Sequence, residues 1–235
     1  MILCIDAGHG GIDGGATGFG KKEKNINLTL ALAIGQALEE YNGAYIIYTR
    51  TTDKYLTLTQ RCNIANKANA NLFVSIHCNA DKKKASGFES YCYYGAYDST
   101  QTIRQAIHDK VAKIFVDGGI PDRGKKFAGF TVLQKTAMPA ILFENGFIDF
   151  KKDNDFVNNK IFTIANAYAE AIAQVFKLTA KKQTYIVQKG DTLWSIARKA
   201  HPDYNNTEVA GYVNKIMAVN KVGNLIYPNQ KLLLP

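Results

Sequence analysis

The chain has 235 residues, of which 46% are apolar, and a formal net charge of +9. This length accommodates one substantial domain and one small domain, and the ordinary apolar content argues against a disordered chain. No apolar run reaches the roughly 18 residues that a transmembrane helix needs.

The cysteines and the first residues of the chain bear on its compartment. Cys4, Cys62, Cys78 and Cys92 show no CxxC spacing, and the sequence opens at Met1 without a basic leader or a cleavage site. We therefore expect four free thiols and synthesis in the cytoplasm without a signal peptide.

Short apolar runs bounded by Gly, Asn or Pro predict buried strands, and apolar residues at the 3.6-residue period predict helices between them. Strands that alternate with helices indicate βαβ units, so we predict an α/β domain with a mostly parallel twisted sheet flanked by helices. In chain order, the expected elements are a strand at 2–7, a helix at 25–41, a strand at 44–49, a helix at 57–70, strands at 72–77 and 88–93, a helix at 103–116, a strand at 140–144 and a helix at 155–176.

A short polar segment without periodicity, residues 178–182, follows this last helix and predicts a linker. It separates a domain over residues 1–177 from a small domain over residues 183–235. The small domain shows a strand at 185–188, helices at 193–200 and 210–220, and a strand at 231–234, which is a βααβ order. From Thr179 onward, eight Lys or Arg oppose three Asp or Glu, so this segment holds +5 of the net charge and suits an anionic partner.

Two of the four histidines stand where predicted strands end, and ligands gather at the carboxyl ends of strands in α/β sheets. His9 follows the first strand, His77 ends the third and Glu144 ends the last, while Glu23 precedes the first helix behind a glycine-rich loop. Two imidazoles and one carboxylate leave the fourth position of zinc open, which is typical of catalytic sites. A second carboxylate is then available for proton transfer, and zinc activates water at neutral pH.

Each of these residues also has an ordinary structural interpretation. A single histidine at a strand end is usually a hydrogen-bonded structural residue, and Glu23 is also typical of a helix-start carboxylate. Glu144 differs because it follows an apolar run, where an unpaired carboxylate is costly. The coincidence of all four residues favours a metal site. Nucleotide binding is disfavoured because Asp13 stands where the dinucleotide fingerprint needs its third glycine.

At these residues the chain resembles the type 3 family of zinc-dependent N-acetylmuramoyl-L-alanine amidases, over about residues 1–177. The matching motifs are DAGHGGIDGGA from Asp6, EKNINL from Glu23, SIHCNA from Ser75 and ENGFI from Glu144. The resemblance implies that His9, Glu23 and His77 hold one Zn2+ and that Glu144 is the catalytic acid/base. It also implies the bond cleaved by zinc-activated water: the amide between the lactyl group of N-acetylmuramic acid and the L-alanine of the stem peptide.

The chain departs from the family pattern at two points. Asp149 stands where relatives often have Asn, and we expect it to shape a turn. Only residues 81–86 separate Asn79 and Ala80 from Gly87, which is too short for the inhibitory helix of some relatives, so we expect an open site. Asn79 fits both a substrate-facing residue and a turn residue.

The C-terminal segment resembles a LysM domain through YIVQKGDTLWSIA from Tyr185 and NLIYPNQKL from Asn224. The resemblance implies a groove for N-acetylglucosamine units between residues 190–193 and 225–229. Leu193 and Trp194 also fit the core of so small a domain, and for Trp194 we favour the core. Asn replaces the usual Gly at position 229, where we expect a left-handed turn. The candidate glycan contacts are Gly190, Asp191, Thr192, Leu193, Ile226, Pro228 and Asn229.

Both resemblances together predict a monomeric peptidoglycan hydrolase, with a muropeptide in the catalytic site, glycan on the LysM domain, and no nucleic-acid or membrane partner. A phage endolysin that reaches the wall through a pore or after lysis is the favoured setting, and an autolysin or a mother-cell lysis amidase is the alternative. The intact site residues disfavour a catalytically silent wall-binding protein, and the LysM segment disfavours a zinc peptidase. A nucleic-acid-binding protein is disfavoured because the sequence has no nucleic-acid motif.

Overall fold

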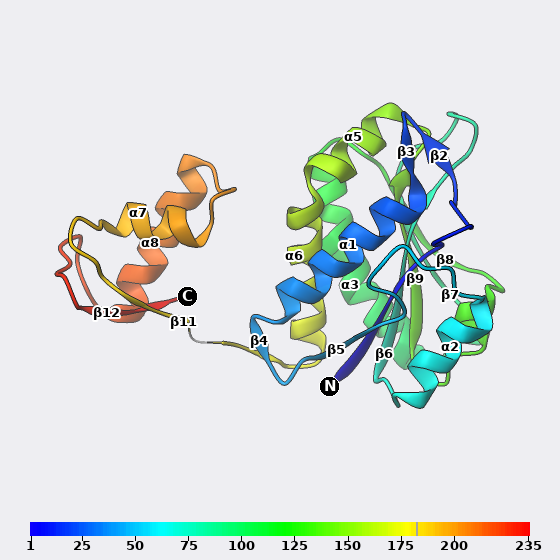
Figure 1. Ribbon diagram of the computed structural model, residues 1–235, viewed down its shortest axis with the longest axis horizontal. Helices are drawn as coiled ribbons and strands as arrows, with labels where there is room; N and C mark the ends of the chain where they lie inside the picture. The colour runs from blue at the N-terminus through cyan, green and yellow to red at the C-terminus, as the bar shows by residue number, and fades with distance from the viewer. Residues whose placement is uncertain (182) are drawn as a thin grey trace. The chain divides into compact units, whose positions relative to one another are not determined.

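The computed structural model describes residues 1–181 and 183–235 (Figure 1). The chain divides into two compact units, Met1–Thr179 and Ala180–Pro235. The predicted linker includes Lys182, which lies outside the described residues. Part of this segment is not irregular as expected, because Thr179–Ala180 forms a short strand, β10, that pairs with β4 (Tyr41–Asn42). Within the described residues, no helix combines the length and the apolar character needed to cross a bilayer.

A six-stranded sheet lies at the centre of the first unit. Its strands are β1 (Ile2–Ala7), β5 (Tyr45–Tyr48), β6 (Leu72–Asn79), β7 (Phe88–Cys92), β8 (Asp122–Phe127) and β9 (Ala140–Phe147). They lie in the order β5-β1-β6-β9-β7-β8, and only the β7–β9 pair is antiparallel. The predicted α/β class with a mostly parallel sheet is therefore confirmed.

Helices cover both faces of this sheet, as Figure 1 shows for α2 on one side and α1, α3 and α6 on the other. One face packs on α1 (Glu23–Leu38), α3 (Asp98–Asp117) and α6 (Ile161–Val175), and the other packs on α2 (Leu58–Lys67) and α4 (Thr131–Gln134). Side chains alternate between the faces. Ile76 and Phe143 therefore belong to the α1/α6 core, whereas Phe73 and Leu142 belong to the α2/α4 core.

The same alternation places three polar residues side by side on the α2/α4 face. His77 of β6 is paired in register with Glu144 of β9, which is paired in turn with Glu89 of β7. The hairpin β2 (Thr17–Gly18) and β3 (Lys21–Lys22) leads into α1, whose first residue is Glu23. The strands and the start of α1 thus bring the predicted site residues to one end of the sheet.

The structure also differs from the sequence-based expectation in the last helical segment of the first unit and in β8. The single helix expected at 155–176 is two helices, α5 (Lys151–Asn159) and α6, separated by Lys160 with φ −117°. Asn158 and Asn159 are poor helix formers that precede the break. The edge strand β8 was not predicted because its sequence, DRGKKF, is mostly polar, as is common for strands at a sheet edge.

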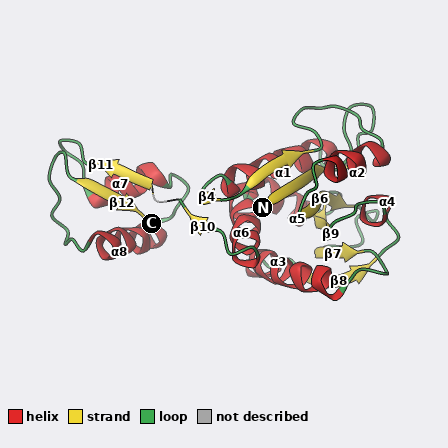
Figure 2. Cartoon of the chain, turned by 90° about the horizontal axis from the view of Figure 1, so that it is seen from below, coloured by secondary structure: helices red, strands yellow, loops and turns green. Residues whose placement is uncertain are grey.

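The second unit has the predicted βααβ order, and its strands and helices can be followed in Figure 2. Its elements are β11 (Gln183–Ile186), α7 (Leu193–Ala200), α8 (Asn206–Asn220) and β12 (Lys231–Leu234), with the two strands antiparallel. Ile196, Val209, Ile216 and Leu232 are buried in a core of its own.

Candidate active site

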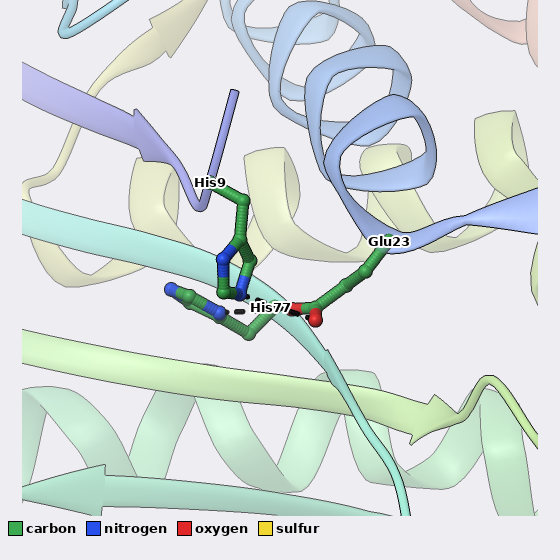
Figure 3. A group of neighbouring side chains, drawn as sticks. All are labelled: His9, Glu23 and His77. Carbon is green, nitrogen blue, oxygen red and sulfur yellow. Dashed lines mark hydrogen bonds and ion pairs between the residues drawn. The ribbon is translucent and has the colours of Figure 1, made fainter. Parts of the chain in front are cut away.

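His9, Glu23 and His77 converge although they come from three separate segments (Figure 3). Glu23 lies between the two imidazoles, with Oε2 3.1 Å from His9 Nε2 and Oε1 3.0 Å from His77 Nδ1. One potential ligand atom from each of the three residues lies within 4.8 Å of the other two. The structure therefore brings the three predicted metal ligands into one group that is able to hold a single ion.

Two glycines leave the space that these side chains occupy. A Cβ atom at Gly8 would lie 2.3 Å from His77 Cε1, and a Cβ atom at Gly15 would lie 2.6 Å from Glu23 Oε2. The Gly8 amide also donates a hydrogen bond of 3.1 Å to the Ile76 carbonyl, which keeps the turn after β1 against β6. The glycine-rich loop is thus needed for close approach of the backbone to the site.

Two buried arginines, which could not be identified from the sequence, hold this loop in place by donating hydrogen bonds to its carbonyl groups. Arg61 of α2 donates to the Asp6 carboxylate at 2.8 Å and to the His9 carbonyl at 2.7 Å. Arg50 donates to the Gly8 carbonyl at 2.9 Å. Burial alone would raise the pKa of Asp6, but the Arg61 charge and two hydroxyl donors outweigh it and hold that pKa below its usual value. Asp6 therefore remains an anion that anchors Arg61.

The metal-site side chains are oriented by a further set of hydrogen bonds. His9 Nδ1 lies 2.9 Å from Asp13 Oδ2, so the Nε2 atom of the same ring points at Glu23. Glu23 Oε1 accepts hydrogen bonds from Asn27 Nδ2 at 3.1 Å and from the Cys78 amide at 3.2 Å. Carboxylates that hold the second nitrogen of a ligand histidine are typical of metal sites. Asp13 was noted in the sequence only as the residue that breaks a dinucleotide fingerprint.

The charges of this group favour a cation. Burial raises the pKa of Glu23, but hydrogen bonds with His77 and His9 outweigh burial, so the net shift is downward. Burial likewise lowers the pKa of His9, but Glu23 and Asp13 outweigh it and raise that pKa to about 9. Protons therefore occupy this group in the metal-free protein. Binding of a metal ion displaces them, which makes affinity for the metal depend on pH.

Glu144 lies beside His77 on the neighbouring strand, as predicted for a residue that shares the site. Its Oε2 atom is buried and has no hydrogen-bond partner in the described part of the chain. Burial is the largest cause that raises the pKa of Glu144 to about 7, and the Glu23 and Glu89 charges add to it against the opposing His77. A carboxyl group whose pKa lies near neutral pH can both accept and return a proton at physiological pH.

Asn79 and Asp149 both make hydrogen bonds inside the protein. Asn79 Nδ2 donates to Glu89 at 2.7 Å, and its Oδ1 accepts from the Ala80 amide at 2.7 Å, which favours a structural role over a substrate-facing one. Asp149 accepts from the backbone amide of Lys83 at 2.9 Å. It therefore shapes the loop after β6. Residues 81–86 contain no helix, and the open site stays a prediction.

In the second unit, the candidate glycan contacts lie in two neighbouring loops. The Asn229 amide donates to the Val187 carbonyl at 2.8 Å, which joins the loop after β11 to the loop before β12. Asn229 has φ 68°, so the predicted left-handed turn is confirmed, and Gly190 has φ 90°. Pro228 is exposed, whereas Ile226 is partly buried against the core.

The other candidates of this unit have structural roles as well. Leu193 is 4% exposed and belongs to the core of this unit, so its side chain does not offer a ligand surface. Trp194 is 42% exposed, and the core position that we favoured for it is wrong because it stands on the outer side of α7. Asp191 accepts from Lys199 at 2.8 Å, and the Thr192 side chain caps α7.

The first unit is a mostly parallel α/β domain. Its convergent His-Glu-His group, with the Glu144 carboxyl and its buried Oε2 atom beside it, defines the class of protein as a hydrolase with a candidate metal centre. A family model described as N-acetylmuramoyl-L-alanine amidase matches residues 3–174, and a LysM domain model matches residues 185–235. The chain belongs to the N-acetylmuramoyl-L-alanine amidase family.

Individual relatives agree with this assignment. The sporulation-specific N-acetylmuramoyl-L-alanine amidase of Bacillus subtilis (strain 168) is 40% identical over 215 residues, which cover 89% of this chain and 82% of that protein. The endolysin of Bacillus phage SPP1 is 38% identical over 198 residues, which cover 81% of this chain and 71% of that protein. The catalytic domain of CwlV, an amidase from Bacillus (Paenibacillus) polymyxa var. colistinus, superposes with a TM-score of 0.70 at 30% identity, covering 76% of this chain and 99% of that one.

The predicted activity is thereby confirmed. The protein is a cell-wall amidase that hydrolyses the bond between N-acetylmuramic acid and L-alanine in peptidoglycan, and it carries a C-terminal LysM domain.

Proposed function

We propose that this amidase works with one zinc ion held by His9, Glu23 and His77, and that Glu144 is its catalytic acid/base. The observation that carries the proposal is the buried, unpartnered Oε2 atom of Glu144 next to three convergent ligand atoms. A buried polar atom without a partner is costly unless a reactant or bound water satisfies it.

The residues present fit zinc. Two imidazole nitrogens and one carboxylate oxygen are a common protein ligand set for catalytic zinc, and they leave one position open. Asp13 supplies the orienting carboxylate behind His9. When bound, zinc polarises a carbonyl group and lowers the pKa of water, which is the chemistry that hydrolysis of an unactivated amide requires.

The protein's own residues account for the proton transfers. Glu144 accepts a proton from the attacking water as the bond between water oxygen and lactyl carbonyl carbon forms. It then delivers this proton to the alanine nitrogen as the carbon–nitrogen bond breaks. Its pKa of about 7 suits both steps, because the carboxyl is neither a strong acid nor permanently protonated at neutral pH.

We expect Glu144→Gln to retain zinc and wall binding but to lose on the order of a hundredfold or more in turnover, because the amide cannot accept the proton. The measurement is the release of new alanine amino groups from purified sacculi, together with the zinc content. Glu170→Gln is a matched control, since Glu170 is an exposed residue of α6 paired with Lys110. Retained turnover in Glu144→Gln would exclude this residue as the acid/base.

We further propose that the LysM domain binds N-acetylglucosamine units through residues 190–193 and 225–229, and that the monomeric protein acts in lysis. Similarity to a phage endolysin and to a sporulation-specific amidase supports this role. A phage endolysin is the favoured setting, and a bacterial autolysin or a mother-cell lysis amidase is the alternative. Expression with and without a pore-forming phage protein tests this: an endolysin lyses cells only when the pore is present, and lysis without a pore contradicts it.

A further inference from the structure

A charged group that has no part in the proposed proton transfers lies one strand away from Glu144. It consists of Glu89 on β7 with Arg123 and Lys126 on β8. Glu89 is 1% exposed, and its Oε2 atom accepts hydrogen bonds from Arg123 Nε at 2.8 Å and from Lys126 Nζ. Two cations therefore share one buried carboxylate, and the group keeps a net positive charge.

Glu89 has no further capacity to neutralise these cations. Its other oxygen, Oε1, already accepts from Asn79 Nδ2 at 2.7 Å and from the Tyr91 hydroxyl at 2.8 Å. Since an ionised carboxylate has about four acceptor sites, Glu89 is saturated. It fixes the positions of Arg123 and Lys126 without using all of their donors.

Arg123 and Lys126 remain accessible and are held in place. Their side chains are 35% and 37% exposed. Arg123 lies over the Phe147 ring at 5.0 Å, and Lys126 lies over the Tyr91 ring at 5.8 Å. The terminal guanidinium nitrogens of Arg123 make no hydrogen bond to any described residue. These donors are thus fixed in direction and open to a ligand.

An irregularity in β8 lets both cations reach Glu89, the neighbour of Glu144 in the sheet. The register between β7 and β8 shifts between Phe88 and Ser90, opposite Gly124, which has φ 83°. Such a bulge adds a residue to one strand, so that Arg123 and Lys126 both reach Glu89. The intervening Lys125 has the opposite orientation and pairs with Asp109 of α3 at 2.7 Å.

We propose that Arg123 and Lys126 bind a free carboxylate of the stem peptide, and that Glu89 is the positioning residue that holds them. The inference rests on the amidase function and extends it to substrate recognition. A guanidinium fork beside an ammonium group is suited to a carboxylate. The carboxylate nearest the scissile amide is the α-carboxylate of the γ-linked glutamyl residue that follows L-alanine, and in some walls it is amidated.

The test is calorimetric binding of two product-like peptides to the zinc-loaded full-length protein. Both are L-alanyl-γ-D-glutamyl-L-lysinamide, one with the glutamyl α-carboxylate free and one with it amidated. We expect the free acid to bind about tenfold more tightly, the scale of one charge-assisted hydrogen bond. Arg123→Gln and Lys126→Gln should each reduce this preference, whereas Lys125→Gln, the matched control on the same strand, should keep it.

Equal binding of the two peptides by the unaltered protein would overturn the inference. A full preference for the free acid in both Arg123→Gln and Lys126→Gln would also overturn it. The same holds if these variants lose no more of the preference than Lys125→Gln does. The peptides contain no scissile bond, so their binding does not depend on turnover. Failure of the unaltered protein to cleave sacculi would instead count against the zinc and Glu144 assignments.

Discussion

Two glycines of the first loop, Gly8 and Gly14, differ in what surrounds them, and the difference is testable. The methyl group of Gly8→Ala would collide with the His77 ring, at 2.3 Å from Cε1, whereas nothing lies within 4 Å of a Cβ atom at Gly14. We expect Gly8→Ala to lose about tenfold or more in zinc affinity, as ligand misplacement does elsewhere. Competition with a chelator measures this loss.

Gly14→Ala is the matched control and should keep the zinc affinity of the unaltered protein. The same chelator competition applies to both variants. If Gly8→Ala held zinc as tightly as Gly14→Ala, the close approach of the backbone to His77 would have no role in forming the site.

For the active site, the residues that converge could be predicted from the sequence, but the residues that hold them in position could not. His9 follows β1, and His77 and Glu144 lie in the carboxyl-terminal halves of β6 and β9, which run slightly beyond their predicted ends. The carboxyl ends of such parallel strands meet at one edge of the sheet. Arg50 and Arg61 could not be identified, because an arginine in a polar segment gives no sign that it is buried. Asp13 was missed because its contact with His9 depends on the path of an irregular loop.

Among the elements, β8 shows why the proposed carboxylate-binding pair, Arg123 and Lys126, could not be predicted from the sequence. Its polar sequence gives no apolar alternation, and the direction of Arg123 and Lys126 depends on a register shift. Strand position and bulges at a sheet edge follow from tertiary pairing and not from local propensity. By contrast, the bounds of β1 and β12 were predicted from their apolar runs because each packs at least one face on a core.

A buried polar network connects α3 to β7 and β8. His108 is fully buried, with Nδ1 2.7 Å from Ser90 Oγ and Nε2 2.9 Å from Asp122 Oδ1. Ser90 is also fully buried, so this arrangement is structural in spite of its likeness to a serine-hydrolase triad. A neutral imidazole satisfies both contacts when the Ser90 hydroxyl donates to Nδ1 and Nε2 donates to Asp122.

This network predicts a loss of stability in acid. Burial lowers the pKa of His108, and Asp122 offsets only part of that shift. The folded protein therefore binds this proton less readily than the unfolded chain, whose His pKa is about 6.5. The stability is present above that value and falls as the pH drops toward the folded-state pKa, by at most about 1.4 kcal/mol per pH unit for one group.

The measurement is the free energy of unfolding in urea between pH ~8 and ~5, for the unaltered protein and for His108→Gln. His9 and His77 titrate in both proteins, so their contributions cancel in the comparison. We expect a shallower decline in acid for His108→Gln. An identical decline would show that His108 takes up its proton without opposing the fold.

Across the whole molecule, each unit has its own hydrophobic core. The cores of the first unit contain residues from β1 to α6, and the core of the second contains residues from β11 to β12. Units with separate cores can in principle fold alone. The candidate metal ligands and Glu144 all belong to the first unit, so we expect the chemistry not to require the second.

Removal of residues 183–235 should therefore separate binding from hydrolysis. We expect the truncated protein to bind whole sacculi at least about tenfold more weakly, because a second attachment to the same polymer raises apparent affinity without new contacts at the first site. Hydrolysis of a small soluble muropeptide, which spans only the catalytic site, should be unchanged. Cosedimentation with sacculi and release of alanine amino groups measure the two quantities.

Ile216→Asp in the 235-residue chain provides a control that leaves the chain length unchanged. Ile216 is fully buried in the core of the second unit, so a carboxylate there should unfold this unit alone. Its sacculus binding should fall to the level of the truncated protein, with muropeptide hydrolysis retained. Undiminished binding to sacculi in both proteins would place wall attachment in the catalytic unit, where the cations of β8 would then be the first residues to test.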